Sequence, residues 1–168
     1  MGLFSKMFGK EDDKPKVLQR DLFNIQVGDI VEFDLADYQV VGKMTFYDGG
    51  YEWYEYQLAG DHGSRWLSSE MDDELELAIY EKIPLKVSEP IPKTIEWEGV
   101  RYELSEKGTA RVQGEGRSQN GSGTDVHYFD YSDETEEKLL SVEIWGGDIE
   151  VSVGRPIEDY EIKIIAGS

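Results

Sequence analysis

A cluster of aromatic and acidic side chains between residues 51 and 66 is the part of this chain with the clearest chemistry. Ring faces and carboxylates both attract an ammonium group, so these residue types are the components of a binding site for an organic cation. Strands are also rich in tyrosine and tryptophan for packing reasons alone, and packing in a core or across strands is the alternative interpretation. The candidate ligand-binding residues are Tyr51, Glu52, Trp53, Tyr54, Glu55, Tyr56 and Trp66.

Catalytic chemistry has few candidates in this sequence. The chain has no cysteine, which excludes disulfides, thiolate metal sites and a cysteine nucleophile. Its two histidines, His62 and His127, lack a metal-binding spacing such as H-E-x-x-H. Ser64 follows Gly63 but does not have the G-x-S-x-G form of a nucleophile elbow. We therefore predict no catalytic residues, no metal site, no cofactor and no enzymatic activity.

Carboxylates are so numerous that abundance singles out no acid and base pair. Glu70 with Glu143, and Glu76 with Glu150, occupy equivalent positions in two similar segments of the chain, each on the polar phase of its strand. This placement favours a solvated face of a sheet. A glycosidase pair of carboxylates is the alternative.

The net charge is strongly negative, because 36 acidic residues oppose 17 basic ones to give −19, with an isoelectric point near 4.3. Nucleic-acid binding is disfavoured, since it depends on clustered lysine and arginine. Strong negative charge keeps a protein soluble, and it also attracts a cationic partner or a cationic small molecule such as a polyamine.

The elements that must position these residues are predicted to be β-strands. Apolar and polar residues alternate with period two through successive segments, as they do in strands with one buried and one wet face. Asp48-Gly49-Gly50 is a strong hairpin signal, and Gly42 indicates a bulge in the preceding strand. Ten or eleven short strands with almost no helical periodicity predict an all-β protein.

An internal repeat organises these strands. Residues 54–79 match residues 129–153 in their alternation, and the cycle of strands restarts after Pro84, Pro90 and Pro92. We predict two pseudo-repeated antiparallel β-sheet halves, each forming a small barrel or together forming one pseudo-symmetric sandwich. The predicted units are a short N-terminal segment with a linker at residues 1–16, a first β repeat at residues 17–90 and a second β repeat at residues 91–168.

The N-terminal segment has an amphipathic pattern. On a helix, Leu3, Phe4, Met7 and Phe8 would share one face, which predicts weak contact with a membrane or a partner. The alternative is a frayed tail that covers part of the domain. With no spanning segment and no secretory signal in the sequence, we expect a cytoplasmic location, peripheral to the inner face of the membrane if this segment docks there.

The order of several motifs resembles a known bacterial family, the domain of unknown function 4178, over about residues 22–165. The resemblance implies an association with bacterial envelope-stress and polyamine-related genes, and the family carries no assigned activity. The motifs that carry it are Val27-Gly28-Asp29, Tyr38-Gln39-Val40-Val41-Gly42, Trp53-Tyr54-Glu55-Tyr56-Gln57-Leu58, Trp66-Leu67-Ser68, and Val142-Glu143-Ile144-Trp145-Gly146 leading to Gly154.

Two functions follow as expectations. The first is a non-catalytic cytoplasmic β-rich adaptor that binds other proteins and is accessory to an envelope-stress or polyamine-related system. The alternative is a binding module for a cationic small molecule such as a polyamine, held by the aromatic and acidic residues between positions 51 and 66.

Overall fold

The computed structural model describes residues 20–167, so the amphipathic pattern predicted for residues 1–16 lies outside the described part of the chain. Among residues 20–167, no helix is long and apolar enough to cross a membrane. The all-β prediction is confirmed. The elements are β1 (Ile30–Phe33), β2 (Ala36–Asp48), β3 (Tyr51–Gly60), β4 (Gly63–Met71), β5 (Leu75–Ile83), β6 (Thr94–Trp97), β7 (Val100–Gly116), the 3₁₀ helix η1 (Gln119–Gly121), β8 (Asp125–Ser132), β9 (Leu139–Trp145), β10 (Asp148–Ile157), η2 (Asp159–Glu161) and β11 (Ile162–Ile165).

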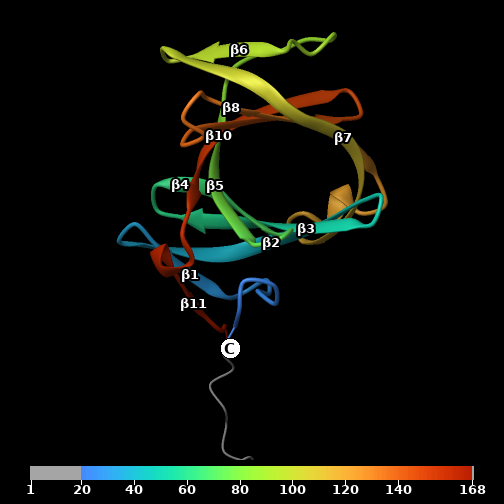
Figure 1. Cartoon of the computed structure of the whole chain (residues 1–168). Helices are drawn as coiled ribbons and strands as arrows, with labels where there is room; N and C mark the ends of the chain where they lie inside the picture. Colours follow the sequence, from blue (N-terminus) through green and yellow to red (C-terminus); the bar gives the residue numbers. More distant parts are fainter. Residues whose placement is uncertain (1–19, 168) are drawn as a thin grey trace, which may run out of the picture.

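Eight of these strands close into one antiparallel barrel. Their order is β2-β3-β4-β5-β10-β9-β8-β7, and β7 pairs with β2 to complete the ring, with Val112 opposite Phe46. β1 and β11 continue the sheet from β2, and β6 continues it from β7. These extensions lie at opposite ends of the molecule, with β6 at the top of the view and β1 and β11 at the bottom (Figure 1).

The two halves of the chain have the same connectivity, a meander of five consecutive strands. Each half also has one register shift between its second and third strands, at Val40/Gly42 and at Leu104/Glu106. Both halves contribute four strands to a single barrel, which differs from the predicted pair of small barrels or sandwich. Four strands alone would leave two open edges, and these are paired across the halves, β5 with β10 and β2 with β7. Equivalence of the halves residue by residue stays a prediction.

The outer face of the barrel wall is apolar and is covered by other parts of the same chain. On one side, Tyr56, Leu58 and Leu67 are fully buried in a cluster that Ile25 and Val31 complete from the N-terminal segment and β1. Burial of this surface is the main stabilising term available to such a layer.

The opposite side has a second outer cluster, built on Tyr131, Leu140 and Val142. β6 and the proline-rich connection after β5 cover it, with Leu85 and Val87 packed against it. No strand forms over residues 84–93 of this connection. Pro84 fits this outcome because proline cannot donate to a strand ladder.

The polar phase of the strands therefore faces the inside of the barrel. Part of this interior is filled by an apolar plug, in which Phe46 stacks on Trp53 with ring centroids 5.2 Å apart. The plug consists of Met44, Phe46, Ala110, Val112, Val126 and Tyr128, with Trp53, Trp66 and Trp145 packed against it.

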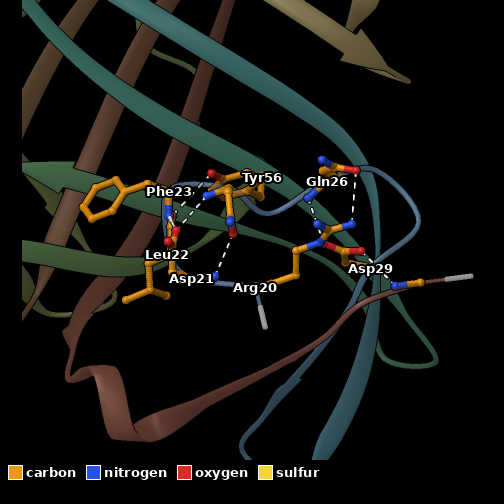
Figure 2. A network of polar contacts seen from close by, with 9 residues as sticks. Arg20, Asp21, Leu22, Phe23, Gln26, Asp29 and Tyr56 are labelled. Carbon is orange, nitrogen blue, oxygen red and sulfur yellow. Dashed lines mark hydrogen bonds and ion pairs between the residues drawn. The ribbon is translucent and has the colours of Figure 1, made fainter. Parts of the chain in front are cut away.

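Asp29 joins the two ends of the described chain to the barrel (Figure 2). Its carboxylate is 2% exposed and accepts hydrogen bonds from Nε of Arg20 at 3.0 Å, the backbone N–H of Gln26 at 2.8 Å and the backbone N–H of Gly167 at 2.9 Å. A buried carboxylate is costly unless its oxygens accept hydrogen bonds, and these three donors satisfy that requirement. The Val27-Gly28-Asp29 motif thus has a structural role.

Candidate functional site

A cavity of about 580 Å³ lies inside the barrel beside the apolar plug. Of the described residues that line it, ten are carboxylates and one, Lys82, is basic. Aromatic and small polar side chains complete the wall, among them Trp53, Trp66, Tyr80 and Tyr128. The ten carboxylates are Glu55, Glu70, Glu74, Glu76, Glu106, Asp130, Glu136, Glu143, Glu150 and Glu158.

Strand register places six of these carboxylates directly opposite one another in pairs. Like charges at opposed positions of an antiparallel ladder destabilise the sheet, and side chains opposed in this way have Cβ atoms only about 5 Å apart. Within this barrel such pairs recur on three different pairs of strands. They are Glu70 opposite Glu76, Glu106 opposite Asp130, and Glu143 opposite Glu150.

Three carboxylates of the cavity wall, Glu55, Asp130 and Glu143, are partly buried and have raised pKa values. Burial raises the pKa of Asp130 to about 7, and the charge of Glu106 adds to the effect. Burial also raises the pKa of Glu143 to about 7, reinforced by Glu150 and Asp130 and opposed by the neighbouring Trp145 side chain and Lys82. The pKa of Glu55 is raised well above its usual value, first by burial and then by Glu143. Near neutral pH this cluster therefore carries both protons and negative charge.

Lys82 is the basic member of the cavity wall. Its Nζ donates a hydrogen bond to Oε1 of Glu150 at 3.0 Å and lies 5.3 Å from the centroid of the Trp66 ring. Tyr80 lies opposite Trp66 in the ladder between β4 and β5. Burial raises the pKa of the Tyr80 phenol, with further contributions from Asp130 and the other carboxylates, so this hydroxyl remains a hydrogen-bond donor at neutral pH.

The ligand-binding residues predicted from the sequence are divided between the two faces of the barrel wall. Trp53, Glu55 and Trp66 line the cavity. The four others do not: three of them lie on the opposite face of β3, because successive side chains of a strand point to opposite faces, and Tyr51, which has the same phase as Trp53, is at the exposed start of the strand. These are Tyr51, Glu52, Tyr54 and Tyr56, of which Tyr51 is 62% exposed and Tyr56 is fully buried in the outer cluster.

The outer group of predicted residues has partners of its own. The Tyr54 hydroxyl donates a hydrogen bond of 2.6 Å to Glu52, which, with burial, raises the tyrosine pKa to about 12. The Tyr56 hydroxyl donates to the backbone carbonyl of Leu22 at 3.3 Å (Figure 2). Nζ of Lys43 lies over both rings, 5.1 Å from the centroid of Tyr54. A cation already occupies these ring faces from within the chain.

Other residues considered from the sequence are distant from this chemistry. His62 and His127 are both exposed, and Nδ1 of His127 is 2.8 Å from the hydroxyl of Thr109 on the outer surface. In the range 20–167 there is no group of three or more histidine, cysteine, aspartate or glutamate side chains arranged to hold a metal ion.

The main residues that sequence reasoning missed are Asp130, Tyr80 and Lys82. Glu70, Glu76, Glu143 and Glu150 were assigned to a solvated face of a sheet, and this assignment is corrected by their place in the cavity wall. The sequence did contain a signal for these residues, because each of them is at a polar position in the alternating pattern of its strand. Their phase faces inward because the apolar phase is covered from outside by β1, β6, β11 and the connection after β5.

A groove of about 1070 Å³ crosses the outer surface where β5 meets β10. The tips of two hairpins border it, with Phe33 from β1 on one side and Trp97 from β6 on the other. Arg155 lies in this groove, with its guanidinium carbon 5.3 Å from the centroid of the Phe33 ring. The groove combines aromatic and charged side chains.

Comparison with known proteins places the barrel in a family. The sequence model of the domain of unknown function DUF4178 matches residues 26–159, which span the barrel from the segment before β1 to the start of η2. The chain belongs to the DUF4178 family. Two of the features described above contain residues of the DUF4178 motifs. Asp29 joins the two ends of the described chain to the barrel, and Glu55, Trp66 and Glu143 line the cavity.

Relatives of this DUF4178 chain are uncharacterised bacterial proteins. One from Mycobacterium tuberculosis is 31% identical over 144 residues, which cover 82% of this chain and 69% of the relative. Another, from Aquifex aeolicus, is 25% identical over 174 residues, covering 95% of this chain and 94% of the relative. No solved structure matches the chain.

Proposed function

We propose that this DUF4178 protein is a non-catalytic binding module for a small organic cation, an aliphatic amine such as a polyamine, held inside the barrel. The observation that carries the proposal is the composition of the cavity wall, in which ten carboxylates face a single ammonium group. An amine supplies the positive charge that this wall lacks.

The volume and shape of the site support a small ligand. Binding cavities for small molecules usually have about 300–1,000 Å³, and the cavity of about 580 Å³ falls in this range. An eight-stranded barrel is also just wide enough to hold one small ligand among its inward-facing side chains. The plug residues Met44 and Trp53 offer apolar surface to an alkyl chain at one end of this space.

The opposed carboxylates support a cationic ligand in particular. Pairs such as Glu106 with Asp130 weaken an empty barrel, and local rules of this kind are typically broken where function requires it. A bound ammonium group would stabilise both carboxylates at once. The overall charge of −19 would also attract cations, although its long-range effect is screened beyond about 8 Å at physiological salt.

Isothermal titration calorimetry with spermidine at physiological salt tests the proposal. We expect saturable binding to the natural protein and at least about tenfold weaker binding after Glu55→Gln, which removes an ionisable carboxyl group from the cavity at nearly constant shape. Glu52→Gln is the matched control, because Glu52 is on the same strand but faces outside. Equal effects of the two substitutions, or binding that disappears at physiological salt, would leave only nonspecific attraction.

A protein partner is the second candidate function, supported by the groove on the outer surface. Its aromatic members Phe33 and Trp97 and its charged member Arg155 are residue types enriched in protein interfaces. In this role the chain would act as a cytoplasmic adaptor accessory to an envelope-stress or polyamine-related system. Affinity capture from a native lysate with the natural protein and with Trp97→Ala tests it, and a partner retained equally by both would contradict use of this groove.

A further inference from the structure

Lys82 already binds inside the cavity as a primary ammonium group. Its hydrogen bond to Glu150 and its position over the ring of Trp66 combine a carboxylate with an aromatic face, the two contacts that favour an organic ammonium. The side chains of Lys82 and Glu150 are 47% and 38% exposed, so water reaches this pair and exchange of the ammonium group is feasible. The chain thus contains one filled ammonium subsite.

A second group of carboxylates lies beside this subsite without a cation. Among residues 20–167, neither Glu55 nor Glu143 takes part in an ion pair. Glu143 is directly opposite Glu150 in the ladder between β9 and β10, so the two subsites are adjacent. The carboxylate of Asp130 accepts one long hydrogen bond, 3.4 Å, from the hydroxyl of Ser141. This inner group has room and charge for one further ammonium.

We propose that Lys82 is a built-in occupant of one of two adjacent ammonium subsites, so that the natural cavity accepts a single ammonium group from its ligand, beside Glu55 and Glu143. This inference rests on the proposed function and specifies its ligand class as amines that place one ammonium group in the inner subsite. Further charged groups of a longer polyamine would remain near the acidic residues at the mouth, such as Glu76 and Glu106, which are exposed.

The consequence is a selectivity that one substitution should change. Lys82→Met removes the occupant and keeps a side chain of similar length, which opens the subsite between Glu150 and Trp66. A short diamine can then use both subsites, whereas a monoamine can use only one. The loss of a positive charge strengthens the attraction for both amines, so the informative quantity is the ratio of their dissociation constants.

Calorimetric titrations with butylamine and 1,4-diaminobutane at physiological salt measure this ratio. In the natural protein the two dissociation constants should agree within about threefold, while in Lys82→Met the diamine should bind about tenfold or more tightly than the monoamine, a gain of about 1.4 kcal/mol. Lys86→Met is the matched control, because Lys86 is exposed on the connection after β5, does not line the cavity and carries the same charge. Its ratio should equal that of the natural protein.

The outcomes separate this inference from the proposed function. Binding of both amines with an unchanged ratio in Lys82→Met would overturn the role of Lys82 and leave cation binding intact. Failure of both amines to bind either protein would overturn both. Thermal unfolding midpoints of Lys82→Met and of a second variant, Lys82→Gln, establish that each is folded, and the two variants should change the ratio in the same direction.

Discussion

Glu55 and Tyr56 are neighbours on β3 and face opposite sides of the barrel wall. Glu55 lines the acidic cavity, whereas Tyr56 is fully buried in the outer apolar cluster. This relationship reverses the arrangement of a barrel with an apolar interior. It places a group of carboxylates inside the barrel, and several of the predictions below depend on it.

Trp66 should contribute to amine affinity through its ring. Trp66→Leu keeps an apolar side chain but removes the aromatic face that Lys82 now contacts. In the Lys82→Met background, where this ring face is open to the ligand, we expect spermidine affinity to fall by about fivefold to thirtyfold, equivalent to about 1–2 kcal/mol of desolvated cation–π contact. Tyr54→Leu is the control, since Tyr54 is on the outer face. Calorimetry that finds the larger loss for Tyr54→Leu would place the cation site outside the barrel.

The free protein should become less stable as the pH rises from about 5 to 8. The pKa values of Asp130 and Glu143 are raised to about 7, above their values of about 4 in an unfolded chain, so the folded state retains protons that the unfolded state has released. The free energy of unfolding therefore falls through this window. Because water in the cavity screens these charges, we expect the free energy of unfolding to fall by only on the order of 1–2 kcal/mol. Urea unfolding at several pH values measures it.

A double variant provides the control for this pH dependence. Asp130→Asn combined with Glu143→Gln removes two of the groups with raised pKa values at nearly constant volume, and it should reduce the dependence between pH 5 and 8, leaving the contribution of Glu55, whose pKa is also raised. Asp133 and Glu161, whose pKa values are lowered, titrate below this window and do not interfere. Stability that rises with pH in the natural protein would contradict a buried acidic interior.

Asp29→Asn should destabilise the fold without changing the cavity. The variant loses the ion pair with Arg20. Its side-chain NH₂ group would also face a backbone N–H group, of Gln26 or Gly167, whose hydrogen bond the Asp29 carboxylate accepts in the natural protein. We expect the free energy of unfolding to fall by about 2–4 kcal/mol. Asp34→Asn is the control, at an exposed turn position with positive φ that asparagine tolerates. Chemical denaturation measures the free energy of unfolding of both variants. Equal losses would contradict the role of Asp29 in joining the two ends of the described chain to the barrel.

Gly154→Ala should destabilise the seam between the two halves. Gly154 pairs with Tyr80 across β10 and β5, and an added Cβ would collide with the carbonyl oxygen of Ile79 and lie 2.7 Å from the Tyr80 ring. We expect a loss of about 2 kcal/mol or more from this overpacking. Gly147→Ala has open space around it and should cost little. Thermal unfolding of the two variants side by side tests the difference.

Local signals in the sequence were sufficient for the strands and turns. The hairpin at Gly49 and Gly50 forms with both glycines at positive φ, and the register shifts next to Gly42 as expected for a bulge. Alternation also identified which residues share a face. It could not show which face is enclosed, because that depends on the closing pair β2 and β7 and on coverage by β6 and β11, contacts between residues far apart in the sequence.

The candidate site was recovered only in part for the same reason. Trp53, Glu55 and Trp66 were selected as neighbours in sequence, and they do line the cavity. Their partners Asp130 and Glu143 come from β8 and β9, across the barrel, and no local pattern brings them together with Glu55. Barrel closure converts a polar phase that resembles a solvated surface into an enclosed wall of carboxylates.

The four tryptophan indole N–H resonances offer the most direct measurement of where a cation binds. Trp53, Trp66 and Trp145 pack against the interior plug, and Trp97 packs against the outer cluster under β6. In a ¹H–¹⁵N NMR titration with spermidine at physiological salt, we expect saturable shifts among the interior resonances of Trp53, Trp66 and Trp145, with Trp97 unchanged. Shifts confined to Trp97, or equal small shifts of all four resonances, would contradict an interior cation site.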